Sequence, residues 1–192
     1  MNEKKTIALF GGSFDPPHIG HETIVKAVSD LKYVDKVVMM PTFLNPFKSF
    51  SHASAELRLK WLKEIFLKYK NVEVSSYEID QNKKVSTIET VLHLLKSYDK
   101  IYLIIGADNL SSLHKWDRFS QLKKLVSFVV ASRNKIEIDH DFLKLDIDVD
   151  ISSTSLRDEI DIKKLPIECA KEIKKFYKEQ NAKQNRKNNT SA

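Results

Sequence analysis

The sequence lacks the usual features of secreted and membrane-spanning proteins. It has one cysteine, Cys169, so no disulfide can form within the chain. No stretch approaches the ~20 apolar residues of a membrane-spanning helix, and the apolar run at residues 7–10 is too short for the core of a signal peptide. We therefore expect a soluble, cytoplasmic protein with no membrane partner.

A metal-binding pattern, internal repeats and an interdomain linker are also absent from the sequence. Four of the histidines show no spacing typical of metal ligands, namely His52, His93, His114 and His140. With 192 residues and 42% hydrophobic content, the chain is long enough for one domain with its own core.

The last fifteen residues differ from the rest of the chain. Residues 178–192 carry Lys178, Lys183, Arg186 and Lys187 against the single acid Glu179, and they contain almost no apolar residue. Such a segment cannot bury enough surface to offset the entropy that is lost when it orders. We predict one domain over residues 1–177 and a disordered basic tail over residues 178–192.

The charge balance is positive but modest. The chain has 32 Lys and Arg against 26 Asp and Glu, a net charge of +6. This excess fits a protein that handles anions such as nucleotides, or one that touches nucleic acid through its tail. We favour a solvated tail, so no nucleic-acid partner is expected.

Short apolar runs alternate with longer amphipathic segments along the chain. The runs predict buried strands at residues 6–10, 36–40, 72–74, 101–105, 126–131 and near 147–149. Apolar residues spaced three and four apart predict helices at 19–31, 55–69, 87–95, from 156 and at 167–177. This alternation predicts an α/β fold with one doubly wound parallel sheet covered by helices. Ligands of such sheets bind beyond the carboxyl ends of the strands, where the strand order reverses.

The segment after the first predicted strand reads GGSFDPPHIGH, residues 11–21. Its glycine pair permits a tight turn with no side chain in the way, so that phosphate can approach the backbone N–H groups of the following helix. His18 and His21 are three residues apart, face the same side, and can donate to phosphate oxygens that gain charge during transfer. The glycine between them leaves room for a flat group such as adenine. Two surface histidines on an ordinary turn are the weaker interpretation of the complete string.

A second segment, ISSTSLR at residues 151–157, closes the predicted sheet and opens a helix. Ser153 or Thr154 can cap that helix by accepting from its free N–H groups. Arg157, one turn later, can reach a phosphate with its planar donor fork. Taken alone, this segment would be an ordinary N-cap with a surface arginine.

Both segments resemble motifs of the nucleotidyltransferase superfamily, the first its Gly-x-Phe-x-Pro-x-His-x-Gly-His signature and the second its Ile-Ser-Ser-Thr-x-x-Arg motif. The resemblance implies a single-domain, Rossmann-like fold and transfer without a covalent intermediate, with His18, His21 and Arg157 as the catalytic residues at the ATP phosphates. It also implies ATP contacts from Gly11, Gly12, Ser13, Phe14, Gly20, Ser153 and Thr154. His-x-Gly-His occurs as well in class I aminoacyl-tRNA synthetases, which are usually far longer and carry a Lys-Met-Ser-Lys-Ser loop that this sequence lacks.

Two residues after the strand at 101–105 bear on the second substrate. Asp108 could accept from a ribose hydroxyl, or it could cap the next short helix. Trp116 stands in a polar run, where it either covers the core or offers a stacking surface to a flat ring.

Over nearly the whole chain to about residue 177, these segments resemble the bacterial nicotinate-nucleotide adenylyltransferase family. The resemblance implies that Trp116 stacks on the nicotinate ring, that Asp108 binds on the nucleotide side, and that Thr87 holds the nicotinate carboxylate. Lys48 would lie near the ATP phosphates. The chain departs from the family at Phe47, where Pro-Pro-His-Lys has histidine, and at Ser86, where Ser-Tyr-Thr has tyrosine.

We therefore predict transfer of the adenylyl group of ATP to nicotinate mononucleotide, which gives nicotinate adenine dinucleotide and pyrophosphate in NAD biosynthesis. Mg²⁺ would bind mainly through the ATP phosphates, with no dedicated protein site. The alternatives are the same chemistry on nicotinamide mononucleotide or phosphopantetheine, a nucleotide-binding module without turnover, and nucleic-acid binding through the tail. The sequence does not indicate whether the protein is a monomer or an oligomer.

Overall fold

A computed structural model describes residues 5–132, 138–147 and 151–190 of the chain. Its centre is one sheet of six parallel strands in the order β3-β2-β1-β4-β5-β6. The strands are β1 (Thr6–Gly12), β2 (Lys36–Pro41), β3 (Val72–Val74), β4 (Lys100–Gly106), β5 (Ser127–Ser132) and β6 (Leu143–Asp146). This arrangement confirms the predicted doubly wound α/β fold.

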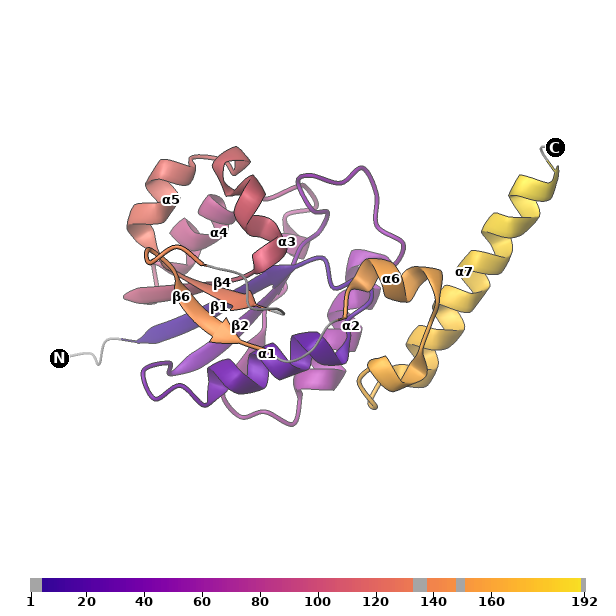
Figure 1. The fold of residues 1–192 in the computed structure, drawn as a ribbon, viewed down its shortest axis with the longest axis horizontal. Helices are drawn as coiled ribbons and strands as arrows, with labels where there is room; N and C mark the ends of the chain where they lie inside the picture. Colours follow the sequence, from indigo (N-terminus) through magenta and orange to yellow (C-terminus); the bar gives the residue numbers. More distant parts are fainter. Residues whose placement is uncertain (1–4, 133–137, 148–150, 191–192) are drawn as a thin grey trace.

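Helices cover both faces of the sheet (Figure 1). They are α1 (Ile19–Ser29), α2 (Ala55–Phe66), α3 (Tyr77–Asp80), α4 (Thr87–Leu94), α5 (Phe119–Leu125), α6 (Ser153–Asp158) and α7 (Ala170–Thr190), with 3₁₀ helices η1 (Ala107–Lys115) and η2 (Ile162–Lys164). In the view of Figure 1, α3, α4 and α5 lie above the sheet and α1 and α2 lie below it.

The two faces of β1 belong to two separate apolar clusters, because successive side chains of a strand point to opposite faces. Ala8 and Phe10 join a cluster with apolar residues of α1, α2 and α7. Ile7 and Leu9 join a second cluster with apolar residues of α4 and α5. The strand is buried on both sides, which explains its almost uninterrupted apolar run.

The strand order reverses between β1 and β4. From β1 the chain builds outward through β2 to β3, then returns to place β4 on the other side of β1. The loops that leave the carboxyl ends of these two neighbouring strands therefore diverge, and this is where sheets of this class bind ligands. Residues 13–18 leave β1 at this point, and η1 leaves β4.

The tail differs from its prediction. Residues 178–190 continue α7 as a helix instead of standing apart as a disordered segment. Lys, Glu, Gln and Ala are good helix formers, and extending a helix that is already anchored requires no new nucleus. The amide of Asn181 also donates to the main-chain oxygen of Arg157 at 2.9 Å.

The last strand and several short elements also differ from the predictions. β6 ends at Asp146, before the strand predicted near 147–149, of which residues 148 and 149 lie outside the described residues. The sequence interpretation also missed α3, α5 and η2, and it gave no bounds for the short helix after the fourth strand, which is η1. Elements this short bury few apolar residues, so they leave little periodicity in the sequence.

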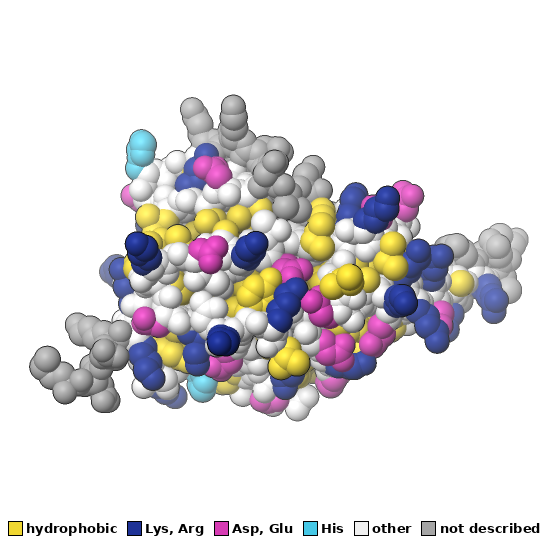
Figure 2. Space-filling view, turned by 90° about the horizontal axis from the view of Figure 1, so that it is seen from below, with side chains coloured by type: hydrophobic (Ala, Val, Ile, Leu, Met, Phe, Trp, Pro, Cys, Tyr) yellow, Lys and Arg dark blue, Asp and Glu magenta, His cyan; other side chains and the backbone are white. Residues whose placement is uncertain are grey.

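The described part of the chain contains no helix that is long and apolar enough to cross a membrane. Figure 2 shows Lys and Arg side chains at the α7 end of one face, with Asp and Glu among them. Exposed lysines of α7, such as Lys171, Lys175 and Lys178, contribute to this basic character.

Candidate active site

The glycine pair lies at the end of β1 and not in a turn as predicted. Gly11 pairs with Met40 and Gly12 with Pro41, and neither glycine has a positive φ. Phe14, not a glycine, has the left-handed backbone conformation after the strand, with a φ of 49°. A Cβ on Gly12 would come within 3.1 Å of the Phe14 ring. The absence of a side chain at Gly12 therefore lets the Phe14 ring pack closely against the end of the strand.

His18 and His21 face the same side of α1, as their spacing predicts. Their rings stack with centroids 3.6 Å apart and an interplanar angle of 24°. His18 is buried and immediately precedes α1, whereas His21 is half-buried in its first turn. The edge of the Phe14 ring packs against His21 at 4.9 Å between centroids, so the residue that makes the turn also orients this imidazole.

A hydrogen bond determines which nitrogen of His21 can act as a donor. The backbone N–H of His18 donates to Nδ1 of His21 at 3.1 Å. In a neutral imidazole, a nitrogen that accepts carries no proton, so Nε2 carries it. Nε2–H is therefore the donor that His21 can offer to an anion.

The two predicted phosphate segments meet, although more than 130 residues separate them in the sequence. The hydroxyl of Ser153 donates to the main-chain oxygen of Pro16 at 2.8 Å. Nη1 of Arg157 donates to the main-chain oxygen of Asp15 at 2.6 Å. Nη2 of Arg157 donates to the hydroxyl of Thr154 at 3.0 Å, which orients the guanidinium from within α6. The sequence predicted Ser153 or Thr154 as the cap of α6, but the N-cap is Ser152, whose hydroxyl accepts from the N–H of Ser155.

Lys48 lies near this junction, in the loop after β2. The residue as a whole is exposed, but shielding of its ammonium group and the nearby positive charge of Arg157 hold the pKa of Lys48 below its ordinary value. An anion bound between Lys48 and Arg157 would be attracted by both positive charges and would offset their mutual repulsion. The arrangement therefore favours a phosphate-binding role for the pair.

Asp15 organises the loop between β1 and α1, a role that the sequence interpretation missed. Its buried carboxylate accepts from the backbone N–H groups of His52 and Ala53, at 2.8 and 3.0 Å, and from the hydroxyl of Tyr177. Burial raises the pKa of Asp15, but the hydrogen bonds from Tyr177, His52 and Ala53 outweigh it and leave the pKa below its ordinary value. Asp15 is thus a fixed negative charge beneath the phosphate loop.

Arg58 of α2 was also missed, and it joins three loops at this end of the sheet. Its fully buried guanidinium donates to main-chain oxygens after β1, after β2 and before α2. The acceptors are Ser13 at 2.6 Å, Thr42 at 2.8 Å, Phe43 at 2.9 Å and Ala53 at 3.2 Å. The sequence does contain a sign of this role. Arg58 is four residues before Leu62 and seven before Ile65, so it lies on the apolar face of α2, where a cation is unusual.

The predicted acceptor residues lie on α4, η1 and the residue that follows η1. Thr87 is the first residue of α4, and Ser86 is its N-cap. The backbone N–H and the hydroxyl of Ser86 both donate to the carboxylate of Glu89 at 2.8 Å. Asp108 is exposed in the first turn of η1, where Gly106 is the N-cap, so Asp108 is not the cap that one interpretation predicted. Trp116 follows η1 directly.

Trp116 covers part of the core, which is one of the two roles that the sequence left open for it. Its ring is half-buried and packs against the apolar cluster of α4 and β4. Its Nε1–H is shielded from solvent and has no hydrogen-bond partner among the described residues. Residues 85–87 are tied to this region because the hydroxyl of Ser86 donates to the carboxylate of Asp117 at 3.0 Å.

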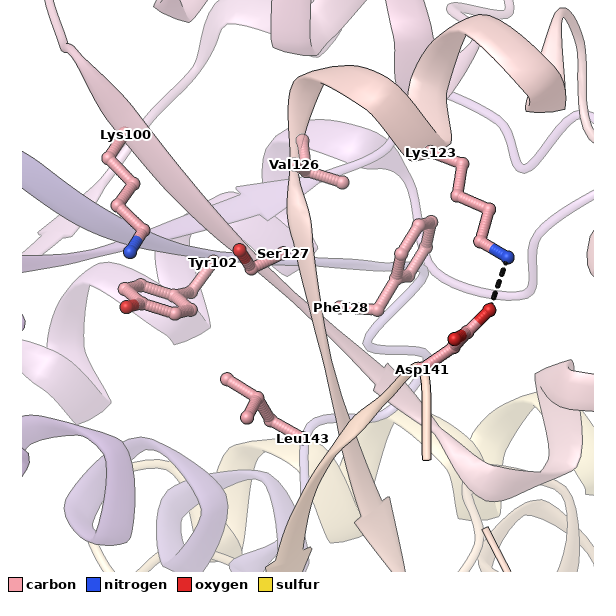
Figure 3. Close-up of a pocket in the computed structure, with 8 residues that line it drawn as sticks. All are labelled: Lys100, Tyr102, Lys123, Val126, Ser127, Phe128, Asp141 and Leu143. Atoms are coloured by element: carbon pink, nitrogen blue, oxygen red, sulfur yellow. Dashed lines mark hydrogen bonds and ion pairs between the residues drawn. The ribbon is translucent and has the colours of Figure 1, made fainter. Parts of the chain in front are cut away.

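A hollow of about 420 Å³ lies at the opposite end of the sheet (Figure 3). Its lining includes Lys100, Ser127 and Leu143, the first residues of β4, β5 and β6. The Lys100 ammonium lies over the ring of Tyr102, and Lys123 is paired with Asp141 at 2.7 Å. The hollow is thus at the amino ends of the strands, away from the two histidines.

Comparison with known proteins identifies the family of the chain. Residues 9–159 match the family described as cytidylyltransferase-like. A protein of Sulfurimonas denitrificans named "Probable nicotinate-nucleotide adenylyltransferase" is 60% identical over 178 residues, which are 93% of this chain and 98% of that protein. A protein of the same name from Campylobacter fetus subsp. fetus is 50% identical over 178 residues, or 92% of this chain and 98% of that one.

The chain belongs to the nicotinate-nucleotide adenylyltransferase family. It is therefore a nucleotidyltransferase, as the two phosphate segments predict. Solved structures of Plasmodium falciparum nicotinic acid mononucleotide adenylyltransferase share the family fold. The complex with NaAD has a TM-score of 0.68 at 21% identity, and the complex with APC has 0.65 at 20%, each over 83% of this chain and 87% of that one. Identities this low support the fold alone.

Proposed function

We propose that this chain transfers the adenylyl group of ATP to nicotinate mononucleotide through His18, His21, Arg157 and Lys48. The acceptor follows from membership of the family, whose named members act on nicotinate nucleotide. The observation that carries the assignment of residues is the contact of Arg157 with Asp15 and of Ser153 with Pro16. These contacts bring Arg157 and the histidine segment into one cationic site at the carboxyl end of β1.

The reaction needs positioned donors and no general base. An oxygen of the acceptor's 5′-phosphate, already ionised near neutral pH, attacks the α-phosphorus of ATP. A new P–O bond forms, the bond between the α-phosphorus and the bridging oxygen breaks, and pyrophosphate leaves with that oxygen. Catalysis then rests on alignment and on stabilisation of charge in the transition state.

Each cationic or donor group has a distinct part in this scheme. Nε2–H of His21 donates to α-phosphate oxygens as their negative charge increases. His18, Arg157 and Lys48 hold the β- and γ-phosphates. Backbone atoms of Gly11, Gly12, Ser13 and Phe14 line the approach, and Gly20 leaves space for adenine. Thr154 orients Arg157, and Ser153 holds the loop after β1 at Pro16.

A divalent metal ion accompanies ATP in nucleotidyltransferases generally. Among the described residues, no group of three His, Cys, Asp or Glu side chains could hold one. We propose that Mg²⁺ binds through the phosphate oxygens, which suits its preference for oxygen ligands and retained water. The ion would neutralise phosphate charge, while the protein donors align the α-phosphate.

The acceptor side of the proposal rests on Thr87, Asp108 and Trp116. The first-turn N–H groups of α4 around Thr87 suit a carboxylate, because a helix N-terminus favours negative charge. Trp116 presents a ring and a buried N–H, and Asp108 an exposed carboxylate for a ribose hydroxyl.

Pyrophosphate release from ATP and Mg²⁺ tests the function, with nicotinate mononucleotide or its amide analogue as acceptor. We expect turnover with the acid, a higher kcat/KM for the acid than for the amide, and a dinucleotide product that chromatography identifies. A preference for the amide would contradict the acceptor assignment. Binding of ATP without pyrophosphate release from any acceptor would identify a nucleotide-binding module instead.

A further inference from the structure

One face of α7 leads from the core to the phosphate site. Ile173, Tyr177 and Asn181 are spaced four apart, so they lie along the same side of the helix. Ile173 and Tyr177 are fully buried, and Tyr177 packs near Trp61 of α2 with ring centroids 6.3 Å apart. Asn181 is half-buried at the outer end of this stripe.

The first polar contact of the stripe is made by Tyr177. Its hydroxyl donates to Oδ1 of Asp15. Burial and the adjacent Asp15 carboxylate raise the pKa of Tyr177, so the hydroxyl remains a donor across the physiological range. The main-chain oxygen of that same Asp15 accepts from the guanidinium of Arg157.

The second contact is made by Asn181, one turn further along α7. Its side-chain amide donates to the main-chain oxygen of Arg157 at 2.9 Å. Tyr177 and Asn181 therefore hold two residues that themselves touch each other, one in the loop after β1 and the other in α6. α7 thus braces the junction between the two phosphate segments.

We propose that Tyr177 and Asn181 are positioning residues that set the place of Asp15 and Arg157 for the phosphates of ATP. This inference rests on the proposed function and goes beyond it, because neither side chain is expected to touch a substrate. It also extends the functional part of the chain beyond residue 177, into the segment whose composition alone resembles a disposable tail.

The positions of the two residues predict which kinetic constant they control. Asp15 and Arg157 lie on the phosphate side of the site, whereas Thr87 and Trp116 lie on α4 and after η1. Loss of the hydrogen bond from Tyr177 or from Asn181 would loosen the loop of Asp15 or Arg157, while the acceptor residues would stay in place. Networks of this kind commonly alter coupling by factors of about 2 to 30.

Two single substitutions test the proposal in the full-length protein. Tyr177→Phe keeps the ring and removes the hydroxyl, and Asn181→Ala removes the amide at a half-buried position. We expect the KM for ATP to rise about 3- to 10-fold in each variant, with the KM for nicotinate mononucleotide changed less than about twofold. Calorimetric titration of ATP in the absence of acceptor should show the same loss of affinity.

Matched controls separate positioning from a general loss of structure. Lys178→Ala changes an exposed residue of α7, and Tyr102→Phe removes a hydroxyl at the far end of the sheet. Both should keep the wild-type KM for ATP. Thermal unfolding of each variant checks that assays are run on folded protein, and Asn181→Ala keeps the test decisive if Tyr177→Phe unfolds.

A double variant shows whether Asn181 acts through Arg157, by combining Asn181→Ala with Arg157→Ala. There, Asn181→Ala should add less than about twofold to the KM for ATP, because residues that share one partner are not additive. An unchanged KM for ATP in both single variants, or equal increases for ATP and acceptor, would overturn the proposal. Failure of the wild-type chain to adenylate nicotinate mononucleotide would instead contradict the function on which it rests.

Discussion

At the scale of single residues, His21 is the side chain on which turnover should depend most. Its Nδ1 is occupied by the N–H of His18, so Nε2–H can point to the α-phosphate. We expect His21→Ala to lower kcat by about 10²–10³-fold, the usual effect of losing one transition-state donor. Steady-state pyrophosphate release at saturating substrates measures it.

His140→Ala is the matched control for that substitution, because His140 is exposed and lies in the segment before β6. It should retain wild-type kcat. A His21→Ala enzyme with full kcat and unchanged KM values would show that another group stabilises the α-phosphate.

Glu78 is a second residue whose chemistry only the structure reveals. Its carboxyl group is buried between α3 and α4, where Oε1 accepts from the hydroxyl of Thr90 at 2.6 Å and Oε2 has no hydrogen-bond partner among the described residues. Burial raises the pKa of Glu78 to about 7, against a lowering by Thr90 and a further increase from Glu89. The folded protein thus favours the neutral acid.

The raised pKa of Glu78 predicts a loss of stability at high pH. Its stabilising contribution is fully present below the unfolded pKa of about 4.5 and is lost as the pH rises through about 7. Relative to Glu78→Gln, the free energy of unfolding of the wild type should fall by about 2–3 kcal/mol between about pH 5 and 8. Urea unfolding at several pH values measures this, and Glu179→Gln, at an exposed position, should show no such trend.

At the scale of elements, α2 holds the site together through one cation. Arg58 donates to four main-chain oxygens in three loops, and burial lowers its pKa while the nearby Asp15 charge raises it. A lysine has a single nitrogen and a shorter reach, so it cannot satisfy these loops together.

We expect Arg58→Lys to destabilise the protein by about 3–5 kcal/mol, the usual effect of breaking a buried charged network. Chemical denaturation measures the change. Arg118→Lys changes an exposed side chain whose guanidinium donates to its neighbour Asp117, and it should stay within about 0.5 kcal/mol of the wild type. A small effect at Arg58 would mean that the loops hold their places without it.

At the scale of the whole molecule, the length of α7 that the enzyme needs is the main question. A chain ending at residue 180 loses Asn181, whereas a chain ending at residue 184 keeps it and removes Arg186 and Lys187. We expect the shorter chain to show a raised KM for ATP, by about 3- to 10-fold, and the longer one to match the wild type. The same assay as for the point variants measures both.

This pair of truncations also tests the alternative role of the basic C-terminus. If nucleic-acid binding were its function, removal of residues 185–192 would weaken binding of a DNA duplex at low salt and leave adenylyl transfer unchanged. Equal KM values for ATP in both truncated chains would contradict the positioning role of Asn181.

The sequence alone determined the fold class and the class of enzyme, a nucleotidyltransferase. Strands buried on both faces appear as continuous apolar runs, and the histidine and arginine motifs are local, so their patterns survive without coordinates. Comparisons with relatives agree with the predicted family and acceptor. The roles of Thr87, Asp108 and Trp116 stay predictions, since no substrate contact tests them.

Only the tertiary structure decided how distant segments meet. The contact of Arg157 with Asp15, the Arg58 cluster and the bonds from Tyr177 and Asn181 join residues far apart in the chain. The composition of residues 178–192 predicted a disordered tail because the segment has almost no apolar residues. Composition does not show that the amide of Asn181, on a helix that is already anchored, donates to Arg157 of α6. Local patterns therefore predicted the reactive groups, and packing determined what holds them in place.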